Sequence, residues 1–180
     1  DDAYQTRFES HIIDQKAENG QTAVLLPETL FYPTSGGQMH DTGRLNDAVV
    51  TDVVIKDGAI WHVLDRPPKE TNVQGEVNWP RRFDFMQQHT AFHLLAAAFK
   101  NEMQIDTLSS HLGEDTLTID LDTFALDWQN IDHIESVANA IIYENRGVSA
   151  RSATKADKQA ALLRKQFENL QETRLVEIEN

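Results

Sequence analysis

The chain has 180 residues and a formal net charge of −13, a length that allows one good hydrophobic core or two small subdomains. Its 40% of hydrophobic residues and three Trp argue against disorder, and no apolar run approaches the roughly 18 residues of a membrane span, so we expect a soluble cytoplasmic protein. The lack of cysteine excludes disulfides and thiolate metal ligands within these residues.

Short strands separated by turns are predicted for residues 1–79. The segments rich in β-branched or aromatic residues are 7–14, 22–27, 48–55 and 59–65. Pairs of Asn, Asp, Ser, Gly and Pro between them mark turns. Strands at this regular spacing predict a small barrel or sandwich.

At Pro80 the pattern becomes helical. Apolar residues recur at helical spacing to about Lys100, with Pro80 suited to the first turn. Strand-like segments at 106–111 and 115–122 follow, then an amphipathic helix ending before Gly147, a short strand near Val148, a helix after Thr154 and a strand over 173–180. Because strands and helices mix without βαβ alternation, we predict an α+β fold, with a small N-terminal β-barrel-like subdomain over residues 1–79 and a second subdomain over 80–180.

Two histidines, His89 and His93, lie four residues apart in the helical run MQQHTAFHLL. This spacing puts both imidazoles on one helix face about one turn apart, where they can grip one metal ion. Such pairs are also common in helices, and two ligands are too few to hold zinc tightly. The spacing alone leaves open whether the pair binds a metal or belongs to the core.

The segment FYPTSGGQMHDTG, residues 31–43, combines two adjacent glycines with polar side chains. Gly36 and Gly37 permit positive φ and close backbone approach, and Gln38, His40 and Asp41 can hydrogen-bond a polar ligand. A tight turn between strands explains the same residues. On the residues alone, the turn is favoured.

Three segments, in this order and spacing, resemble the alanyl-tRNA editing domain: FYPTSGGQMHDTG, VNWPRRFDFMQQHTAFHLL and IESVANAIIYENRGV. That family comprises the editing domain of alanyl-tRNA synthetase and the free-standing AlaX-type trans-editing proteins, and the resemblance spans essentially the whole chain. It implies a small β-barrel joined to an α/β editing core, here over residues 80–180, whose HxxxH-bearing helix binds zinc together with a later CxxxH element. No CxxxH occurs before Asn180, so the resemblance implies that the remaining zinc ligands lie beyond it.

The resemblance also implies roles for individual residues. It makes His89 and His93 metal ligands, and it places Gln38 and the backbone of Ser35, Gly36 and Gly37 in the pocket wall. As the polar side chains nearest the glycine turn, Thr34 and Gln38 are the predicted catalytic residues and the candidates for hydrogen-bonding the serine hydroxyl, although Thr34 equally suits a turn residue bonded to its own backbone. Their positions in the sequence, and not the resemblance, make three further residues candidates for substrate binding. His111 either faces the cleft or is an ordinary strand histidine, and Arg81 and Arg82, at the start of the helix that carries both metal ligands, either reach a phosphate or pair with surface acids.

The implied reaction is hydrolysis of mischarged Ser-tRNA(Ala) or Gly-tRNA(Ala), without ATP. A synthetase pocket cannot exclude glycine and rejects serine only weakly, so a second hydrolytic site is needed. The expected partner is the acceptor end of tRNA(Ala) carrying serine or glycine, and we expect neither DNA nor a membrane as partner. Two alternatives stay open: a non-catalytic tRNA-end-binding module, and a metal-dependent hydrolase of another ester.

One segment departs from the acidic character of the chain. Between residues 146 and 165 a single acid, Asp157, accompanies six basic residues, which are Arg146, Arg151, Lys155, Lys158, Arg164 and Lys165. Lys and Arg supply most of the affinity for phosphates. This segment is therefore predicted either to meet RNA or to form an ordinary solvated helix face.

Overall fold

The computed structural model describes residues 2–18, 20–152 and 174–179. They form two compact units, the first of Asp1–His89 with His111–Thr118 and the second of Thr90–Ser110 with Ile119–Asn180. The mixed α and β composition predicted from the sequence is confirmed. In the part of the chain that is described, no helix is both long and apolar enough to cross a bilayer.

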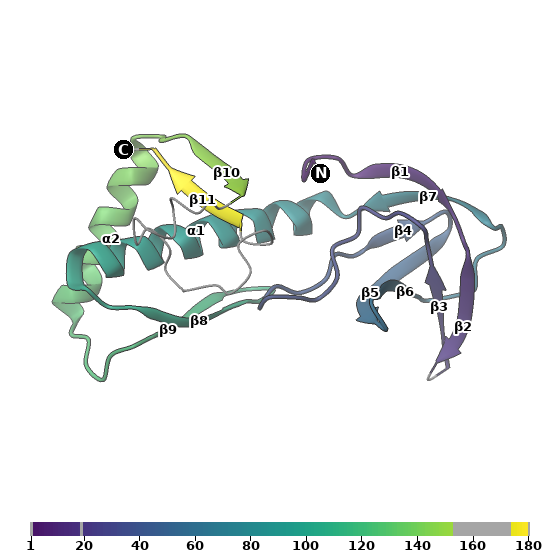
Figure 1. Cartoon of the computed structure of the whole chain (residues 1–180), viewed down its shortest axis with the longest axis horizontal. Helices are drawn as coiled ribbons and strands as arrows, with labels where there is room; N and C mark the ends of the chain where they lie inside the picture. The colour runs from purple at the N-terminus through teal and green to yellow at the C-terminus, as the bar shows by residue number, and fades with distance from the viewer. Residues whose placement is uncertain (1, 19, 153–173, 180) are drawn as a thin grey trace. The chain divides into compact units, whose positions relative to one another are not determined.

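The first unit contains a seven-stranded antiparallel sheet (Figure 1). Its strands are β1 (Arg7–His11), β2 (Asp14–Glu18), β3 (Gln21–Leu25), β4 (Gly43–Leu45), β5 (Ala48–Lys56), β6 (Ala59–Leu64) and β7 (Asn72–Val77). They pair in the order β1-β7-β4-β5-β6-β3-β2. The two edge strands, β1 and β2, follow each other in the chain with only Ile12 and Ile13 between them.

Among the described residues the predicted β-barrel does not form, because the edge strands β1 and β2 do not pair with each other. The predicted single strand over residues 7–14 is instead divided between the two edges of the sheet. Its first half pairs with β7, with Arg7 opposite Glu76, and the chain resumes as β2 against β3, with Asp14 opposite Leu25. The sheet is therefore open.

The core of the first unit lies on one face of this sheet. Its buried residues are Val24, Leu26, Phe31, Leu45, Ala48, Val50, Val53, Leu64, Val73 and Val77. Alternation explains how the strands supply them: in β7 the residues Val73, Gly75 and Val77 are buried, while those between them are exposed. Gly75 is required there because a Cβ would lie 2.1 Å from the ring of Phe8.

One histidine belongs to this unit's interior. His62 on β6 is fully buried, and its ring meets that of Phe31 edge to face at a centroid distance of 5.5 Å. Its Nε2 lies 2.8 Å from the hydroxyl of Thr29 and its Nδ1 3.2 Å from the carbonyl oxygen of Val24. Burial lowers the pKa of His62 to about 4, which the hydrogen bond to Val24 only partly opposes.

The long helix α1 (Trp79–Met103) starts in the first unit, and its C-terminal part belongs to the second. Pro80 lies in its first turn, and the amide N–H of Arg81 donates to the side-chain oxygen of Asn78 at 3.4 Å. The helix continues to Met103, slightly beyond the predicted end. It carries both His89 and His93.

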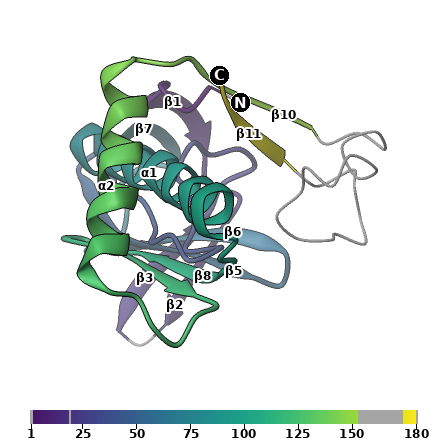
Figure 2. The ribbon, with the colours of Figure 1, turned by 90° about the vertical axis from the view of Figure 1, so that its left-hand side faces the viewer.

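The second unit packs α2 (Trp128–Tyr143) against the C-terminal part of α1 (Figure 2). Ile134 of α2 meets Ala98 and Phe99 of α1, and partly buried apolar side chains surround them. Asp127 caps α2 by accepting a hydrogen bond from the amide N–H of Asn130 at 2.8 Å. β10 (Val148–Ser152) pairs with β11 (Arg174–Ile178) in the same unit, and β8 (Thr107–Leu112) pairs with β9 (Leu117–Leu121).

Candidate functional site

The segment Ser35–Gln38 forms a tight two-residue turn in the first unit. The amide N–H of Gln38 donates to the carbonyl oxygen of Ser35 at 2.9 Å, and that of Ser35 donates back to Gln38 at 3.1 Å. Gly36 and Gly37 adopt φ values of +59° and +85°. Positive φ at both central residues is the type I′ pattern, which residues with a Cβ rarely adopt. The turn favoured from the sequence is confirmed.

Neighbouring segments hold this turn at its base. The carbonyl oxygen of Gly37 accepts a hydrogen bond from the amide N–H of Leu112, at the end of β8, at 2.9 Å. On the other side, the amide N–H of Thr34 donates to the carbonyl oxygen of Val53 on β5 at 3.1 Å. The turn is fixed on both flanks, while Ser35, Gly36 and Gly37 remain exposed and Gln38 is half-buried.

Thr34, just before the turn, is exposed and interacts closely with His40, just after it. Its hydroxyl oxygen accepts a hydrogen bond from the amide N–H of His40 at 3.2 Å and lies 3.2 Å from the imidazole Nδ1. The same Nδ1 lies 3.0 Å from the carboxylate of Asp52, and Nε2 lies 3.1 Å from the carbonyl oxygen of Thr51. Thr34 does bond to nearby backbone, as the turn interpretation expected, yet its hydroxyl stays at the surface.

The two arginines at the start of α1 are placed differently. Arg81 donates from Nε to the carbonyl oxygen of His40 at 2.9 Å and from a terminal nitrogen to Glu114 at 2.9 Å. Its guanidinium also lies over the ring of Phe85, 4.8 Å from the centroid. It joins the segment after the turn to the loop after β8, with a side chain that is 15% exposed.

Arg82 is buried and directed into the protein. Its terminal nitrogen lies 2.6 Å from the carboxylate of Asp41, and its other contacts are the carbonyl oxygens of Ala3 and Leu30. Of the two roles predicted for Arg82, the structure shows the pairing with an acid, although this acid is buried in the protein and is not at its surface. We therefore leave Arg82 out of the substrate-binding set.

The structure adds Gln88 to the surroundings of the turn. Its amide nitrogen donates to the carbonyl oxygen of Gly113 at 3.0 Å and to Asp84 at 2.7 Å. Gly113 follows Leu112, whose amide binds the turn, so Gln88 supports the same loop from α1. In the sequence, only its position next to His89 points to a place near the candidate site. His111 lies in the same loop region at the end of β8, where it is exposed.

Of the two candidate metal ligands on α1, His89 is exposed and His93 is half-buried with its ring 5.1 Å from that of Phe92. Among the described residues, no group of three or more His, Asp or Glu is arranged to hold a metal ion, and the chain has no cysteine. The described residues therefore do not complete a zinc site by themselves.

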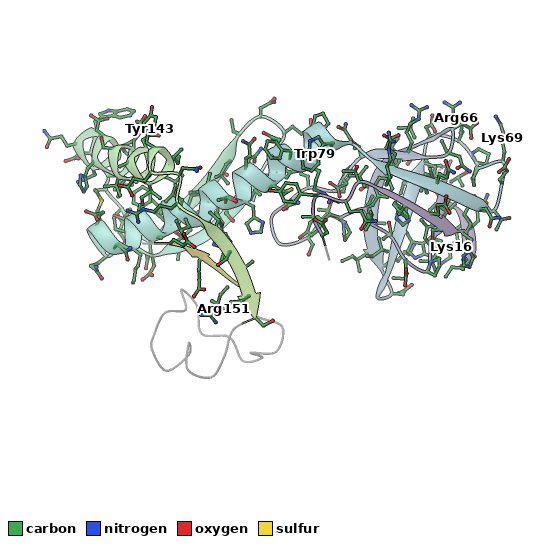
Figure 3. The ribbon with its side chains drawn as sticks, turned by 90° about the horizontal axis from the view of Figure 1, so that it is seen from above. Lys16, Arg66, Lys69, Trp79, Tyr143 and Arg151 are labelled. Carbon is green, nitrogen blue, oxygen red and sulfur yellow. The ribbon has the colours of Figure 1, made fainter. Side chains whose placement is uncertain are left out.

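The basic segment is only partly described. Arg151 on β10 (Figure 3) makes a two-pronged ion pair with Glu177 on β11, at 2.7 and 3.0 Å. Arg146 pairs with Glu144 at 2.6 Å. Lys155, Lys158, Arg164, Lys165 and the helix predicted after Thr154 lie outside the described residues.

Comparison with known proteins places the chain among its relatives, although no protein-family model matches it. Alanyl-tRNA editing protein AlaX-M of Methanosarcina mazei is 33% identical over an alignment that covers 99% of this chain and 78% of that protein. Alanyl-tRNA editing protein AlaX-L of Pyrococcus horikoshii is 30% identical, with 98% of this chain and 46% of that protein covered. Alanine–tRNA ligase of Halobacterium salinarum is 34% identical over 82% of this chain, which is 17% of the ligase.

The similarity to AlaX-M extends over nearly all of this chain and most of the relative, which shows common membership of one class of protein. The chain belongs to the alanyl-tRNA editing protein family.

Proposed function

We propose that this protein edits tRNA(Ala), hydrolysing the ester that joins a wrong amino acid to the terminal adenosine. Family membership supports the reaction class. The observation that carries the proposal is the exposed Ser35–Gln38 turn with the exposed hydroxyl of Thr34 beside it. The substrates we propose are Ser-tRNA(Ala) and Gly-tRNA(Ala).

The turn supplies hydrogen-bond donors for an ester. The amides of Ser35 and Gln38 close the turn, whereas those of Gly36 and Gly37 take no part in these two bonds. Without a Cβ at either glycine, a carbonyl or ribose oxygen can approach this backbone closely. In the proposal, these amides and the side chain of Gln38 hold the acylated ribose, and donors aimed at the ester oxygen stabilise the charge that develops during hydrolysis.

Thr34 supplies the discrimination between serine and alanine. Alanine fits wherever serine fits, so size cannot protect correct Ala-tRNA(Ala). A site that hydrogen-bonds the serine hydroxyl, and that the bound substrate closes off from water, can discriminate by as much as ~10⁴, because alanine then leaves the polar group of the site unpaired. In the proposal, the exposed Thr34 hydroxyl is that group.

Zinc is part of the proposal, with His89 and His93 as two of its ligands. A bound zinc ion would polarise the ester carbonyl or activate a water molecule. Because the described residues do not complete a zinc site, the roles of the turn and of Thr34 are assigned without it.

The proposal is tested by deacylation of Ser-, Gly- and Ala-tRNA(Ala), with metal content measured on the same preparation. Hydrolysis of the first two, with Ala-tRNA(Ala) spared, supports editing. Binding of tRNA without hydrolysis favours a tRNA-end-binding module, and hydrolysis of simple esters alone favours a different hydrolase. Thr34→Val should lower kcat/KM for Ser-tRNA(Ala) far more than for Gly-tRNA(Ala), which has no hydroxyl to read, with Thr71→Val as the exposed control.

A further inference from the structure

The imidazole of His40 lies between the hydroxyl of Thr34, which is proposed to bind the serine of the substrate, and two hydrogen-bond acceptors, the carbonyl oxygen of Thr51 and the carboxylate of Asp52. Its side chain is 16% exposed, and Asp52 beside it is 44% exposed. Its Nε2 faces the carbonyl oxygen of Thr51 at 3.1 Å. Its Nδ1 faces Asp52 at 3.0 Å and the Thr34 hydroxyl at 3.2 Å.

We propose that His40 is a positioning residue that sets the direction of the hydrogen bond offered by Thr34 to the serine hydroxyl of the substrate. The inference rests on the proposed function, in which Thr34 reads that hydroxyl. It concerns His40 and Asp52, to which no role in the reaction has been given above.

The donors and acceptors around the ring support this assignment. A carbonyl oxygen can only accept, so the contact of Nε2 with Thr51 is a hydrogen bond when Nε2 carries a proton. A carboxylate can also only accept, so the contact of Nδ1 with Asp52 is a hydrogen bond when Nδ1 carries a proton. Protons on both nitrogens make the ring a cation beside the carboxylate of Asp52. Two further charged groups are linked to this segment: Arg81 donates to the His40 carbonyl oxygen, and Glu114 pairs with Arg81.

This arrangement determines what Thr34 presents to a ligand. The Thr34 oxygen already accepts the amide N–H of His40 at 3.2 Å. With Nδ1 protonated and directed at Asp52, the ring does not accept the Thr34 hydroxyl proton, which then points outward as a donor. If Nδ1 lacked its proton, it would accept that hydroxyl and turn the donor inward.

An outward donor suits the oxygen of a serine side chain and finds no partner on alanine or glycine. His40 therefore affects serine recognition through Thr34 without touching the substrate. A residue that only stabilised the fold would affect Ser- and Gly-tRNA(Ala) equally.

A matched pair of variants tests this role. In His40→Asn the amide nitrogen takes approximately the place of Nδ1 and keeps a donor for Asp52. In His40→Gln it takes approximately the place of Nε2, which keeps the bond to Thr51 and loses the one at Nδ1. His11→Gln, at an exposed position on β1, is the control.

We expect His40→Gln to lower kcat/KM for Ser-tRNA(Ala) about tenfold more than for Gly-tRNA(Ala), the worth of one hydrogen bond. His40→Asn should recover most of this loss. In combination with Thr34→Val, His40→Gln should cause no further loss of serine selectivity. Unchanged Ser-to-Gly ratios in His40→Gln, equal ratios in the Asn and Gln variants, or additive losses with Thr34→Val would each overturn the positioning role.

The same experiment separates this inference from the function on which it rests. A wild-type protein that hydrolyses neither Ser- nor Gly-tRNA(Ala) refutes the proposed function itself. A wild-type protein that hydrolyses both, with variants that behave alike, leaves the function standing and refutes only the role of His40.

Discussion

Asp41 and Arg82 form a buried ion pair that ties the segment after the Ser35–Gln38 turn to the first turns of α1. Asp41 is fully buried, and its carboxylate lies 2.6 Å from a terminal nitrogen of Arg82. The same carboxylate accepts the amide N–H of Tyr32 at 2.6 Å, and Arg82 also donates to the carbonyl oxygen of Leu30 at 2.6 Å. The residues on both sides of the turn are thus held by one pair of charges.

Asp41→Ala is expected to destabilise the protein by about 3 to 5 kcal/mol, because it leaves the Arg82 charge buried and without its carboxylate. Urea unfolding measures this cost. Glu76→Ala is the control, since it breaks the exposed pair with Arg7 and should cost no more than about 1 kcal/mol. Equal losses in the two variants would mean that burial of the Asp41–Arg82 pair is unimportant.

Gly43→Ala should also be strongly destabilising, by about 3 kcal/mol. A Cβ at this position would lie 2.1 Å from the carbonyl oxygen of Glu76 and 2.8 Å from the ring of Phe31, so β4 would have to move away from β7. Gly58→Ala is the comparison. There no atom lies within 4 Å of the added Cβ, and only the φ of +76° opposes the change, at about 1 to 2 kcal/mol. Thermal unfolding ranks the two, and the reverse order would contradict the close approach at Gly43.

Buried His62 should make the protein less stable as the pH falls below neutral. The unfolded chain protonates this residue near pH 6.5, whereas the folded protein does so only near 4, so unfolding takes up a proton between these values. The contribution of neutral His62 to the free energy of unfolding should therefore be fully present above pH 6.5. About 3 kcal/mol of it should be lost as the pH falls to 4.

Urea unfolding between pH 4 and 6.5 measures this loss, and NMR of the imidazole measures the pKa of His62 directly. His62→Gln should flatten the pH dependence in this range, whereas His11→Gln, at an exposed site, should leave it in place. An imidazole that titrates near 6.5 in the folded protein would remove the basis of this prediction.

Zinc binding by the 180-residue chain should be weak and should depend on His89 and His93. Two imidazoles are fewer than the three or four protein ligands of a typical zinc site. Equilibrium dialysis against zinc should show further weakening in His89→Ala and in His93→Ala, and none in His11→Ala. Tight binding that survives both substitutions would show that other residues hold the metal.

Binding of tRNA should weaken with salt through the basic segment, despite the net charge of −13. Three or four phosphate contacts would give a slope of log affinity against log salt of about −2 to −4. Reversing Lys155 and Lys158 to Glu should make this slope shallower and raise KM with little change in kcat. Arg151 is better left intact, since its ion pair with Glu177 joins β10 to β11. An unchanged slope would separate this segment from RNA binding.

The elements found from the sequence are those with a strong local signal. The helix after Pro80 has apolar residues at helical spacing, and the strands β5 and β6 are rich in β-branched and aromatic residues. β7 was missed although it alternates, because Gly75 stands where an apolar side chain is expected and the ring of Phe8, from a strand 67 residues earlier, covers it. Only the pairing partner explains that glycine.

In the candidate site, too, the local features were predicted from the sequence and the long-range contacts were not. Adjacent glycines predicted the turn at Gly36 and Gly37 because their requirement for positive φ is local. Nothing near Arg82 in the sequence indicates that its partner is Asp41, 41 residues earlier, and nothing near His40 indicates Asp52. Contacts of this kind depend on strand register, which a one-residue shift would change completely.

The division of residues 7–18 between both edges of the sheet has a consequence for synthesis. β2 finds its partner β3 within a few residues, so that hairpin can form as soon as it leaves the ribosome. β1 must wait for β7, since Arg7 pairs with Glu76, and until then the unpaired backbone of β1 is open to other chains. The edge formed by β1 is therefore open to misassembly over the whole interval between its own synthesis and that of β7.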